Sequence, residues 1–214
     1  MPIDSRRILF HDSHFLAVNK LSGELVVKGK GKVGKLPLLD FLRKQYPGLR
    51  PVNRLDFETS GIVLFAQSKG ALEKAMEMPT KKTYLTIVRG RVKPLQGEIR
   101  KPLPARSGKG EVPALTRYQV LGQFRDFALV ECTIESGRHH QIRRHLASIG
   151  HPLLLDDIYG DKTFNHRWGQ KLRMHRFFLH AAALFFHHPF TREWINVEAP
   201  VPRAFEDVLR RLSE

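Results

Sequence analysis

The chain has 214 residues, and its 36 lysines and arginines against 21 aspartates and glutamates give a formal net charge of +15. This length suits one domain with a sizeable core, and a hydrophobic content of 42% with 14 phenylalanines excludes a disordered chain. The apolar run at residues 177–186 is too short to span a membrane as a helix. So large a positive charge favours a polyanion as the partner, because neutralised phosphates release their counterions.

Cysteine content and the N-terminus indicate where the protein works. Cys132 is the single cysteine, so no internal disulfide can form. The first residues lack the apolar segment of a secretory signal. We therefore expect a cytoplasmic protein.

The elements of the first half follow from apolar patterning and turn residues. A hairpin is expected from residues 8–10 and 15–18, because two short apolar runs flank a polar turn. A basic glycine-rich loop follows at residues 28–35, and then a short amphipathic helix around residues 38–42. The continuous apolar run at residues 62–65 predicts a buried strand.

The second half continues the mixture of strands and helices. A helix is expected at residues 69–78, strands at 83–88 and 127–134, and a second basic loop between them at 100–110. Apolar residues at helical spacing predict a helix at residues 138–149.

A last amphipathic helix is expected to open at Pro202. Because strands outnumber helices without alternating regularly with them, the pattern favours an α+β fold with a mixed or antiparallel central sheet. We expect a single domain over residues 1–214, without an internal repeat.

Two motif-like patterns do not support a cofactor or metal site. The run from Gly29 to Lys35 nearly matches a phosphate-binding P-loop, but Leu36 replaces the required hydroxyl residue and Pro37 interrupts the start of the helix. The histidines His139, His140 and His145 lack the spacing of a metal motif. We therefore expect no cofactor and no metal.

The segment at residues 51–61 is the strongest candidate for chemistry. It places Arg54, Asp56, Thr59 and Ser60 in a loop that leads directly into the expected buried strand. Loops held by rigid strands often carry reactive groups, but an acid in such a loop can equally cap a turn. Composition alone leaves these two interpretations about equally supported.

Several segments, in order, resemble the RluA family of RNA pseudouridine synthases. Residues 53–61 resemble its HRLDxxTSG signature, residues 82–85 its KTY(L/V) strand, and residues 137–146 its GRxHQIRxHL segment. Residues 150–153 and 179–189 resemble its GHPIxGD and LHAxxLxFxHP segments. The resemblance spans about residues 8–200 and implies the family's catalytic fold, without an S4-type RNA-binding domain before it.

The resemblance also implies a set of catalytic residues. It assigns Asp56 as the carboxylate that starts cleavage of the glycosidic bond and Tyr84 as the ring near the uracil. It pairs Arg143 with that carboxylate. The helical pattern agrees, since Arg143 falls at the edge of the apolar face whereas Arg144 falls about 200° from Ile142 and should face solvent.

RNA binding is expected from a further set of polar and basic side chains. By resemblance, Arg54 fills the place that the flipped base leaves, since a stacked base cannot reach an enclosed site. The residues expected to bind RNA are Arg54, Asn53, Thr59, Arg138, Arg144, Lys30, Lys32 and Lys35.

Two positions depart from the family pattern. Asn53 stands where the family has histidine, and Leu155 where a glycine usually precedes the aspartate of GHPIxGD. We expect fold and catalysis to survive both changes, with Asn53 still able to supply a polar contact.

The sequence therefore predicts a cofactor-free, cytoplasmic and monomeric RNA pseudouridine synthase that does not bind membranes. Likeness in the downstream segments slightly favours tRNA over ribosomal RNA as the substrate. One alternative is a metal-dependent nuclease that uses Asp56, Asp156, Asp157 and Asp161. Another is an RNA-binding module without catalysis.

Overall fold

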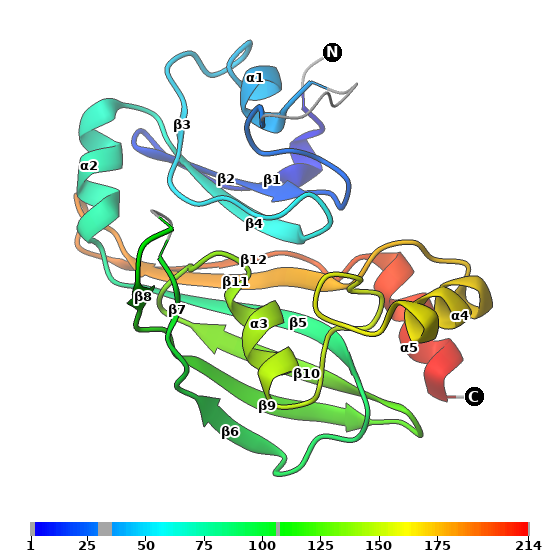
Figure 1. The fold of residues 1–214 in the computed structure, drawn as a ribbon. Helices are drawn as coiled ribbons and strands as arrows, with labels where there is room; N and C mark the ends of the chain where they lie inside the picture. The colour runs from blue at the N-terminus through cyan, green and yellow to red at the C-terminus, as the bar shows by residue number, and fades with distance from the viewer. Residues whose placement is uncertain (1–2, 30–35, 106–107, 214) are drawn as a thin grey trace. The chain divides into compact units, whose positions relative to one another are not determined.

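The computed structural model describes residues 3–29, 36–105 and 108–213. The chain divides into two compact units, Met1–Lys81 with Ala181–Pro200 and Lys82–His180 with Val201–Glu214. Each unit contains both strands and helices (Figure 1). This confirms the predicted α+β class, whereas a single domain over the whole chain remains a prediction.

The first unit is built around an antiparallel sheet. Strand β2 lies between β1 and β4, β3 pairs with the end of β4, and β12 pairs with β11. Its elements in chain order are the 3-10 helix Ser5–Arg7, β1 (Ile8–His11), β2 (Phe15–Lys20), α1 (Leu38–Leu42), β3 (Arg50–Pro51), β4 (Ser60–Ala66), α2 (Lys69–Glu77), β11 (Leu179–His187) and β12 (Trp194–Glu198).

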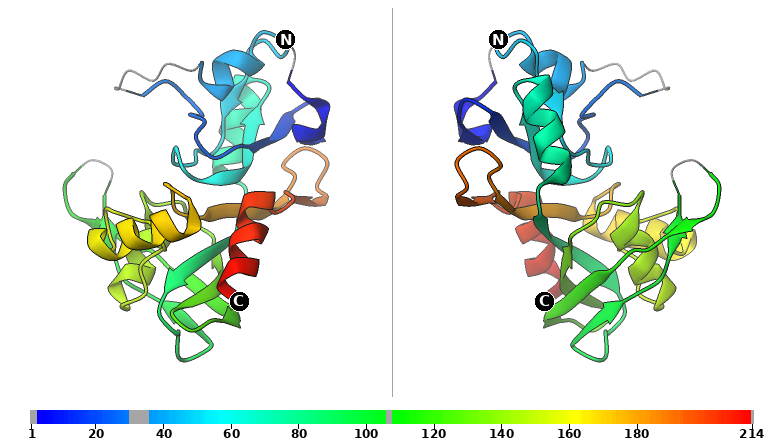
Figure 2. Two further views of the ribbon diagram at one scale, coloured as in Figure 1. Left: turned by 90° about the vertical axis from the view of Figure 1, so that its right-hand side faces the viewer. Right: turned by 90° about the vertical axis from the view of Figure 1, so that its left-hand side faces the viewer.

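Strand β4 is buried on both faces, which explains its continuous apolar sequence. On one face Ile62 and Leu64 pack in a cluster with Ala71 and Ala75 of α2, the helix nearest the viewer in the right-hand view of Figure 2. On the other face Val63 and Phe65 pack in a second cluster, which contains the buried leucines of α1. The loop before β4 is thus attached to a rigid strand.

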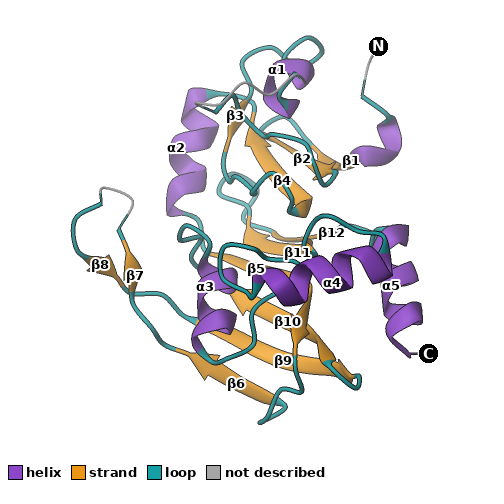
Figure 3. Ribbon diagram, turned by 45° about the vertical axis from the view of Figure 1, so that its right-hand side comes forward, coloured by secondary structure: helices purple, strands orange, loops and turns teal. Residues whose placement is uncertain are grey.

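In the second unit the strands β5, β10, β9 and β6 pair antiparallel in this order, as a further part of the same sheet, and β7 and β8 form a separate two-stranded ribbon. Helix α3 packs against β9 (Figure 3). The elements are β5 (Thr80–Arg89), β6 (Gln96–Ile99), β7 (Leu103–Pro104), β8 (Glu111–Val112), β9 (Thr116–Gln123), β10 (Phe127–Ile134), α3 (Gln141–Ser148), α4 (Lys162–Leu172) and α5 (Arg203–Ser213).

Helices α4 and α5, yellow and red in the left-hand view of Figure 2, meet where Arg211 donates a hydrogen bond to the Leu172 carbonyl oxygen over 3.0 Å. The amphipathic α5 buries Phe205 and Val208. Phe205 packs edge-on against Phe178 with ring centroids 5.0 Å apart. The last helix predicted from the sequence is therefore part of the packed second unit.

Three sequence-based assignments need correction. The expected loop at residues 100–110 contains β7 and leads into β8, so it is partly a two-stranded ribbon. Helix α3 begins at Gln141 rather than at residue 138, because His140 adopts a left-handed backbone with φ of 54°. Helix α4 was not expected at all, although Asp161 caps it by accepting a hydrogen bond from the Phe164 amide at 2.9 Å.

Candidate active site

The loop that carries Asp56 is fastened to strand β4 by hydrogen bonds. The Val52 amide donates to the Leu64 carbonyl oxygen over 2.9 Å. The Asn53 side chain accepts from the Leu64 amide at 2.7 Å and donates to the Ile62 carbonyl oxygen at 3.3 Å. Asn53, which stands in place of the family histidine, thus holds the loop. A contact of Asn53 with RNA remains a prediction.

The end of the loop leaves no room for a side chain at Gly61. A Cβ there would lie 2.2 Å from the Ala181 carbonyl oxygen, and the backbone φ of 104° is one that residues with side chains rarely adopt. The preceding Thr59 and Ser60 are buried, with exposed fractions of 2% and 7%. The Thr59 hydroxyl has no hydrogen-bond partner in the described part of the chain, and its predicted contact with RNA stays a prediction.

Lys20 lies beneath the loop and was not singled out by the sequence. It is fully buried, and its ammonium donates to the carbonyl oxygens of Leu21 at 3.0 Å and Phe57 at 3.1 Å. Burial lowers the pKa of Lys20 to about 8, and the nearby carboxylates Glu24, Glu58 and Asp56 act in the opposite direction. Lys20 thus places a buried cation near the predicted catalytic carboxylate.

The burial of Lys20 could have been foreseen from its strand. The preceding residues 15–18 form an unbroken apolar run, and all four are buried. A lysine that continues such a strand in register with Gly61 is unlike a solvated surface lysine. Arg54 and Asp56, by contrast, reach solvent: Arg54 is exposed and Asp56 half-buried.

Arg143 in the second unit forms a buried ion pair with Asp156. Its Nε and Nη2 atoms donate to the two carboxylate oxygens over 2.7 and 2.8 Å, and the side chains are 3% and 0% exposed. One of these oxygens also accepts from the Ile158 and Tyr159 amides at 3.0 and 3.3 Å. Asp156 is thus bonded well enough to hold the guanidinium in one orientation.

Aromatic rings complete the surroundings of this guanidinium. The Arg143 Cζ lies 4.4 Å from the ring centroid of Phe177 and 5.2 Å from that of Tyr159. The sequence predicts Asp56 as the partner of Arg143, and the structure adds Asp156. Asp56 belongs to the first unit and Arg143 to the second, so their ion pair remains a prediction.

The prediction that Arg144 faces solvent is only partly confirmed, and its contact with RNA remains a prediction. Arg144 is half-buried, and its Cζ lies 5.4 Å from the Tyr159 ring centroid, because the chain after Asp156 covers this side of α3. Its Nε is buried without a hydrogen-bond partner in the described part of the chain. Arg138, before the helix, is exposed as an RNA-binding residue needs to be.

Tyr84 is placed by strand β5. It lies opposite Cys132 of β10 in the antiparallel register and is 7% exposed. The structure thus puts Tyr84 in the same unit as Arg143, and its role at the uracil remains a prediction.

The remaining expectations concern the basic loop, metals and membranes. Lys30, Lys32 and Lys35 fall outside the residues that the structure describes. Among residues 3–29, 36–105 and 108–213, histidine, cysteine, aspartate and glutamate form no group of three or more that could hold a metal ion. No helix within these ranges has the length and apolar content needed to cross a membrane.

Comparison with protein families and curated proteins agrees with these motifs. A family described as RNA pseudouridylate synthase matches residues 14–148. Ribosomal large subunit pseudouridine synthase C of Escherichia coli (strain K12) is 38% identical over 222 residues, which cover 96% of this chain and 69% of that protein. The Vibrio parahaemolyticus protein of the same description is 37% identical over 94% of this chain and 68% of its own length.

Solved structures show the same relationship. Human RNA Pseudouridylate Synthase Domain Containing 4 superposes with a TM-score of 0.79 and 26% identity, covering 97% of this chain and 93% of that one. Human RNA Pseudouridylate Synthase Domain Containing 1 gives 0.72 and 28%, covering 94% and 87%. The chain, with its RluA-type motifs, therefore belongs to the RNA pseudouridylate synthase family and is an RNA pseudouridine synthase.

Proposed function

We propose that this enzyme isomerises a specific uridine of a structured RNA and that Asp56 supplies the carboxylate that starts the reaction. The observation that best supports this proposal is the way in which the loop of Asp56 is held in place. Its backbone is bonded to β4, and Gly23 and Lys20 both donate to the Phe57 carbonyl oxygen, at 2.7 and 3.1 Å. A half-buried carboxylate is thereby presented from a rigid support.

Besides this carboxylate, the reaction needs few other protein groups. The C1′–N1 bond breaks, the detached uracil turns, its C5 joins C1′, the C5 proton leaves to a base, and N1 takes up a proton, so that the product is an isomer of the substrate. Glycosidases need an acid to protonate an alkoxide leaving group, whereas the uracil anion is stabilised by its own carbonyl groups. Asp56 can add to C1′ covalently or remove a sugar proton to form a glycal, and both routes begin with an ionised carboxylate.

The second unit supplies the charge and the ring that this chemistry needs. We assign Arg143 to keeping Asp56 ionised, with Asp156 and Phe177 holding the guanidinium in place. Tyr84 is assigned to stacking on the uracil and helping to remove the C5 proton.

Because the target base must leave its helix or loop, the exposed Arg54 is assigned to filling the space it vacates. Arg138 and the lysines of residues 28–35 contact the RNA backbone in this proposal. Asn53 acts chiefly by supporting the Asp56 loop, and the unpaired Thr59 hydroxyl is assigned to contacting the RNA.

Large-subunit ribosomal RNA is the first candidate substrate. Two relatives with 37 and 38% identity are described as acting on the ribosomal large subunit. The downstream motifs resemble a tRNA-modifying member, so tRNA is the second candidate.

The nuclease alternative is weakened by how its carboxylates are bonded. Asp156 pairs with Arg143, and Asp157 accepts a hydrogen bond from the Asn165 side chain at 2.9 Å. Asp161 caps helix α4. These three groups stabilise the second unit in ways that a metal site would disturb.

Pseudouridine mapping across total RNA from cells with and without this protein tests the proposal. One or a few uridines should lose the modification in its absence, and plasmid-borne wild type or Glu58→Gln should restore them. Asp56→Asn should not, with turnover in vitro lower by about 10⁴-fold or more and RNA affinity kept. Restoration by Asp56→Asn would refute the assignment of the acid, and an unchanged map would refute the function.

A further inference from the structure

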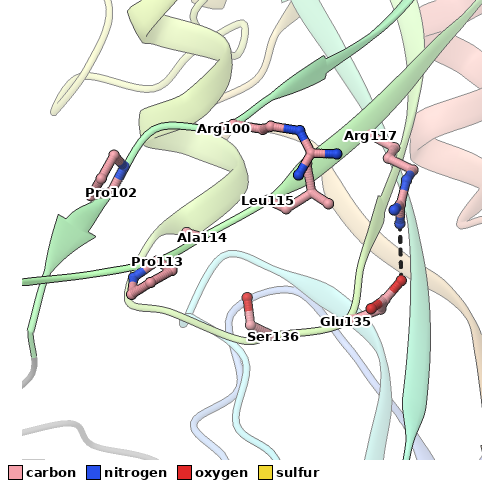
Figure 4. A pocket seen from close by; sticks show the side chains of 8 residues that line it. All are labelled: Arg100, Pro102, Pro113, Ala114, Leu115, Arg117, Glu135 and Ser136. Carbon is pink, nitrogen blue, oxygen red and sulfur yellow. Dashed lines mark hydrogen bonds and ion pairs between the residues drawn. The ribbon is translucent and has the colours of Figure 1, made fainter.

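A hollow with a volume of about 340 Å³ lies in the second unit, where β6 ends and β9 begins (Figure 4). Its walls include Pro102, Pro113 and Leu115, and Figure 4 shows the Arg100 side chain extending over Leu115. Glu135 and Ser136, which follow β10, line the opposite side. Apolar side chains thus face polar groups across a space of small-ligand size.

Buried polar side chains of α3 hold this wall in place. Gln141 is 3% exposed, and its side chain donates to the Leu115 carbonyl oxygen at 2.9 Å and accepts from the Ser136 hydroxyl at 2.9 Å. It therefore ties the two sides of the hollow together. Because the Leu115 carbonyl group and the Ser136 hydroxyl both bond to this one buried amide, the fold itself fixes the shape of the wall.

His145, one turn further along α3, fixes the two segments of the chain that lie next to the hollow. It is fully buried, and its Nε2 donates to the Lys101 carbonyl oxygen at 2.9 Å while Nδ1 accepts from the Thr116 hydroxyl at 2.8 Å. Burial lowers the pKa of His145, which favours the neutral ring that this pattern needs. Gln141, Arg143 and His145 thus share one helix, and the first and last of them shape the hollow.

The rim carries a network of charges. Arg117 bonds to Glu98 and Glu135 at 2.9 Å each, and Arg100 also bonds to Glu98. Two arginines and two glutamates balance one another here. The exposed Lys101 and Arg138, next in the chain to lining residues or close to them, tip the local charge to positive.

We propose that this hollow binds a nucleotide of the RNA substrate other than the target uridine. The inference rests on the proposed function, because it takes RNA as the substrate. A nucleobase would pack its face on Leu115 and the prolines, and its phosphate would meet Arg100, whose side chain is 68% exposed. Tyr84 and Arg143, which belong to the same unit and are assigned to the reacting uridine, are not among the lining residues, so the nucleotide bound here is not the reacting one.

Modified RNAs provide the test, starting from the RNA in which the mapping above locates the pseudouridine. Each nucleotide near the target is replaced in turn by an abasic one, and the dissociation constant is measured for wild type and Leu115→Ala. At one position the abasic change should weaken wild-type binding by about 5- to 100-fold. In Leu115→Ala the same change should have little further effect, because the base contact is already reduced.

The phosphate of the same nucleotide is tested separately. Replacing it by an uncharged methylphosphonate should weaken binding by wild type but not by Arg100→Ala. Arg125→Ala is the matched control, because Arg125 is an exposed arginine at the turn beyond the far end of β9. This control should keep full sensitivity to both RNA changes, and all variants should unfold at the wild-type temperature.

The results separate this inference from the function on which it rests. If wild type forms pseudouridine but no abasic position is coupled to Leu115, the hollow does not bind a base and the inference is wrong. If Arg125→Ala removes the effect of the methylphosphonate as fully as Arg100→Ala does, the phosphate is attracted by the general positive charge, and the inference is also wrong. If wild type forms no pseudouridine in any RNA, the proposed function itself fails.

Discussion

The Asp56 loop of the first unit and helix α3 of the second hold their charged side chains by different means. The loop is fixed mainly through backbone groups, by Asn53 and by the lack of space at Gly61. Helix α3 is fixed through side chains, above all the buried pair of Arg143 and Asp156. The carboxylate of Asp56, the proposed catalytic group, is half-buried, whereas the Arg143 guanidinium is oriented by a counter-charge that is fully buried.

The largest effect is expected from removing that counter-charge. Asp156→Leu leaves the Arg143 guanidinium buried without its carboxylate and leaves the Ile158 amide without its acceptor. We expect the free energy of unfolding to fall by about 3–5 kcal/mol, measured by urea denaturation. Glu73→Gln in the exposed Lys69–Glu73 pair, 3.6 Å apart, should change it by less than about 0.5 kcal/mol.

A double variant shows whether charge is the cause. Arg143→Met with Asp156→Leu should recover much of the lost stability, because two apolar side chains replace the ion pair. Turnover should stay low in this double variant, since Arg143 is gone. A double variant no more stable than Asp156→Leu would mean that Asp156 acts mainly through its bonds to the backbone.

In the loop, the corresponding disruption is steric. Gly61→Ala puts a Cβ against the Ala181 carbonyl oxygen in a strained backbone region, and we expect a loss of about 3 kcal/mol in the free energy of unfolding. Gly70→Ala is the control, because it lies in α2 with no atom within 4 Å of the added Cβ. That change should stabilise the protein by about 0.5 kcal/mol. Equal effects of the two would contradict the steric account.

Much of this architecture was accessible from periodicity. Strand β10 was predicted with its observed bounds, and β4 and α2 within two residues, because apolar runs and a proline mark their ends. Asp56 and Arg143 are site residues predicted by the resemblance of their motifs to one family, and their roles remain predictions.

What the sequence could not show depends on contacts between distant residues. The hydrogen bond from Lys20 to the Phe57 carbonyl oxygen joins residues 37 positions apart, and the ion pair of Arg143 with Asp156 joins residues 13 positions apart. Leu155 stands where the RluA family usually has glycine, and the structure gives the reason for that glycine: the backbone there has φ of 68°.

The buried Lys20, which has no counterpart in helix α3, makes the stability of the first unit depend on pH. The pKa of Lys20 is about 8 in the folded protein against an ordinary value of 10.5, so above pH 8 the unfolded chain binds more protons than the folded one. The stability that Lys20 contributes therefore rises with pH. Relative to Lys20→Met, wild type should gain about 2 kcal/mol between pH 7 and pH 10 in urea titrations. A constant difference would show that the Lys20 pKa is not lowered.

The smallest effect is expected at Asn53, where two interpretations differ. If Asn53 mainly fastens the loop, Asn53→Ala leaves the Leu64 amide unpaired and lowers the free energy of unfolding by about 1–2 kcal/mol. Asn53→Asp can still accept from that amide but cannot donate to the Ile62 carbonyl oxygen, so its loss should be smaller. RNA affinity should change by less than about 3-fold in Asn53→Ala, since the side chain already bonds to the strand. A large loss of affinity with unchanged stability would instead assign Asn53 to the RNA, and the support of the loop would then rest on Val52 and Gly61.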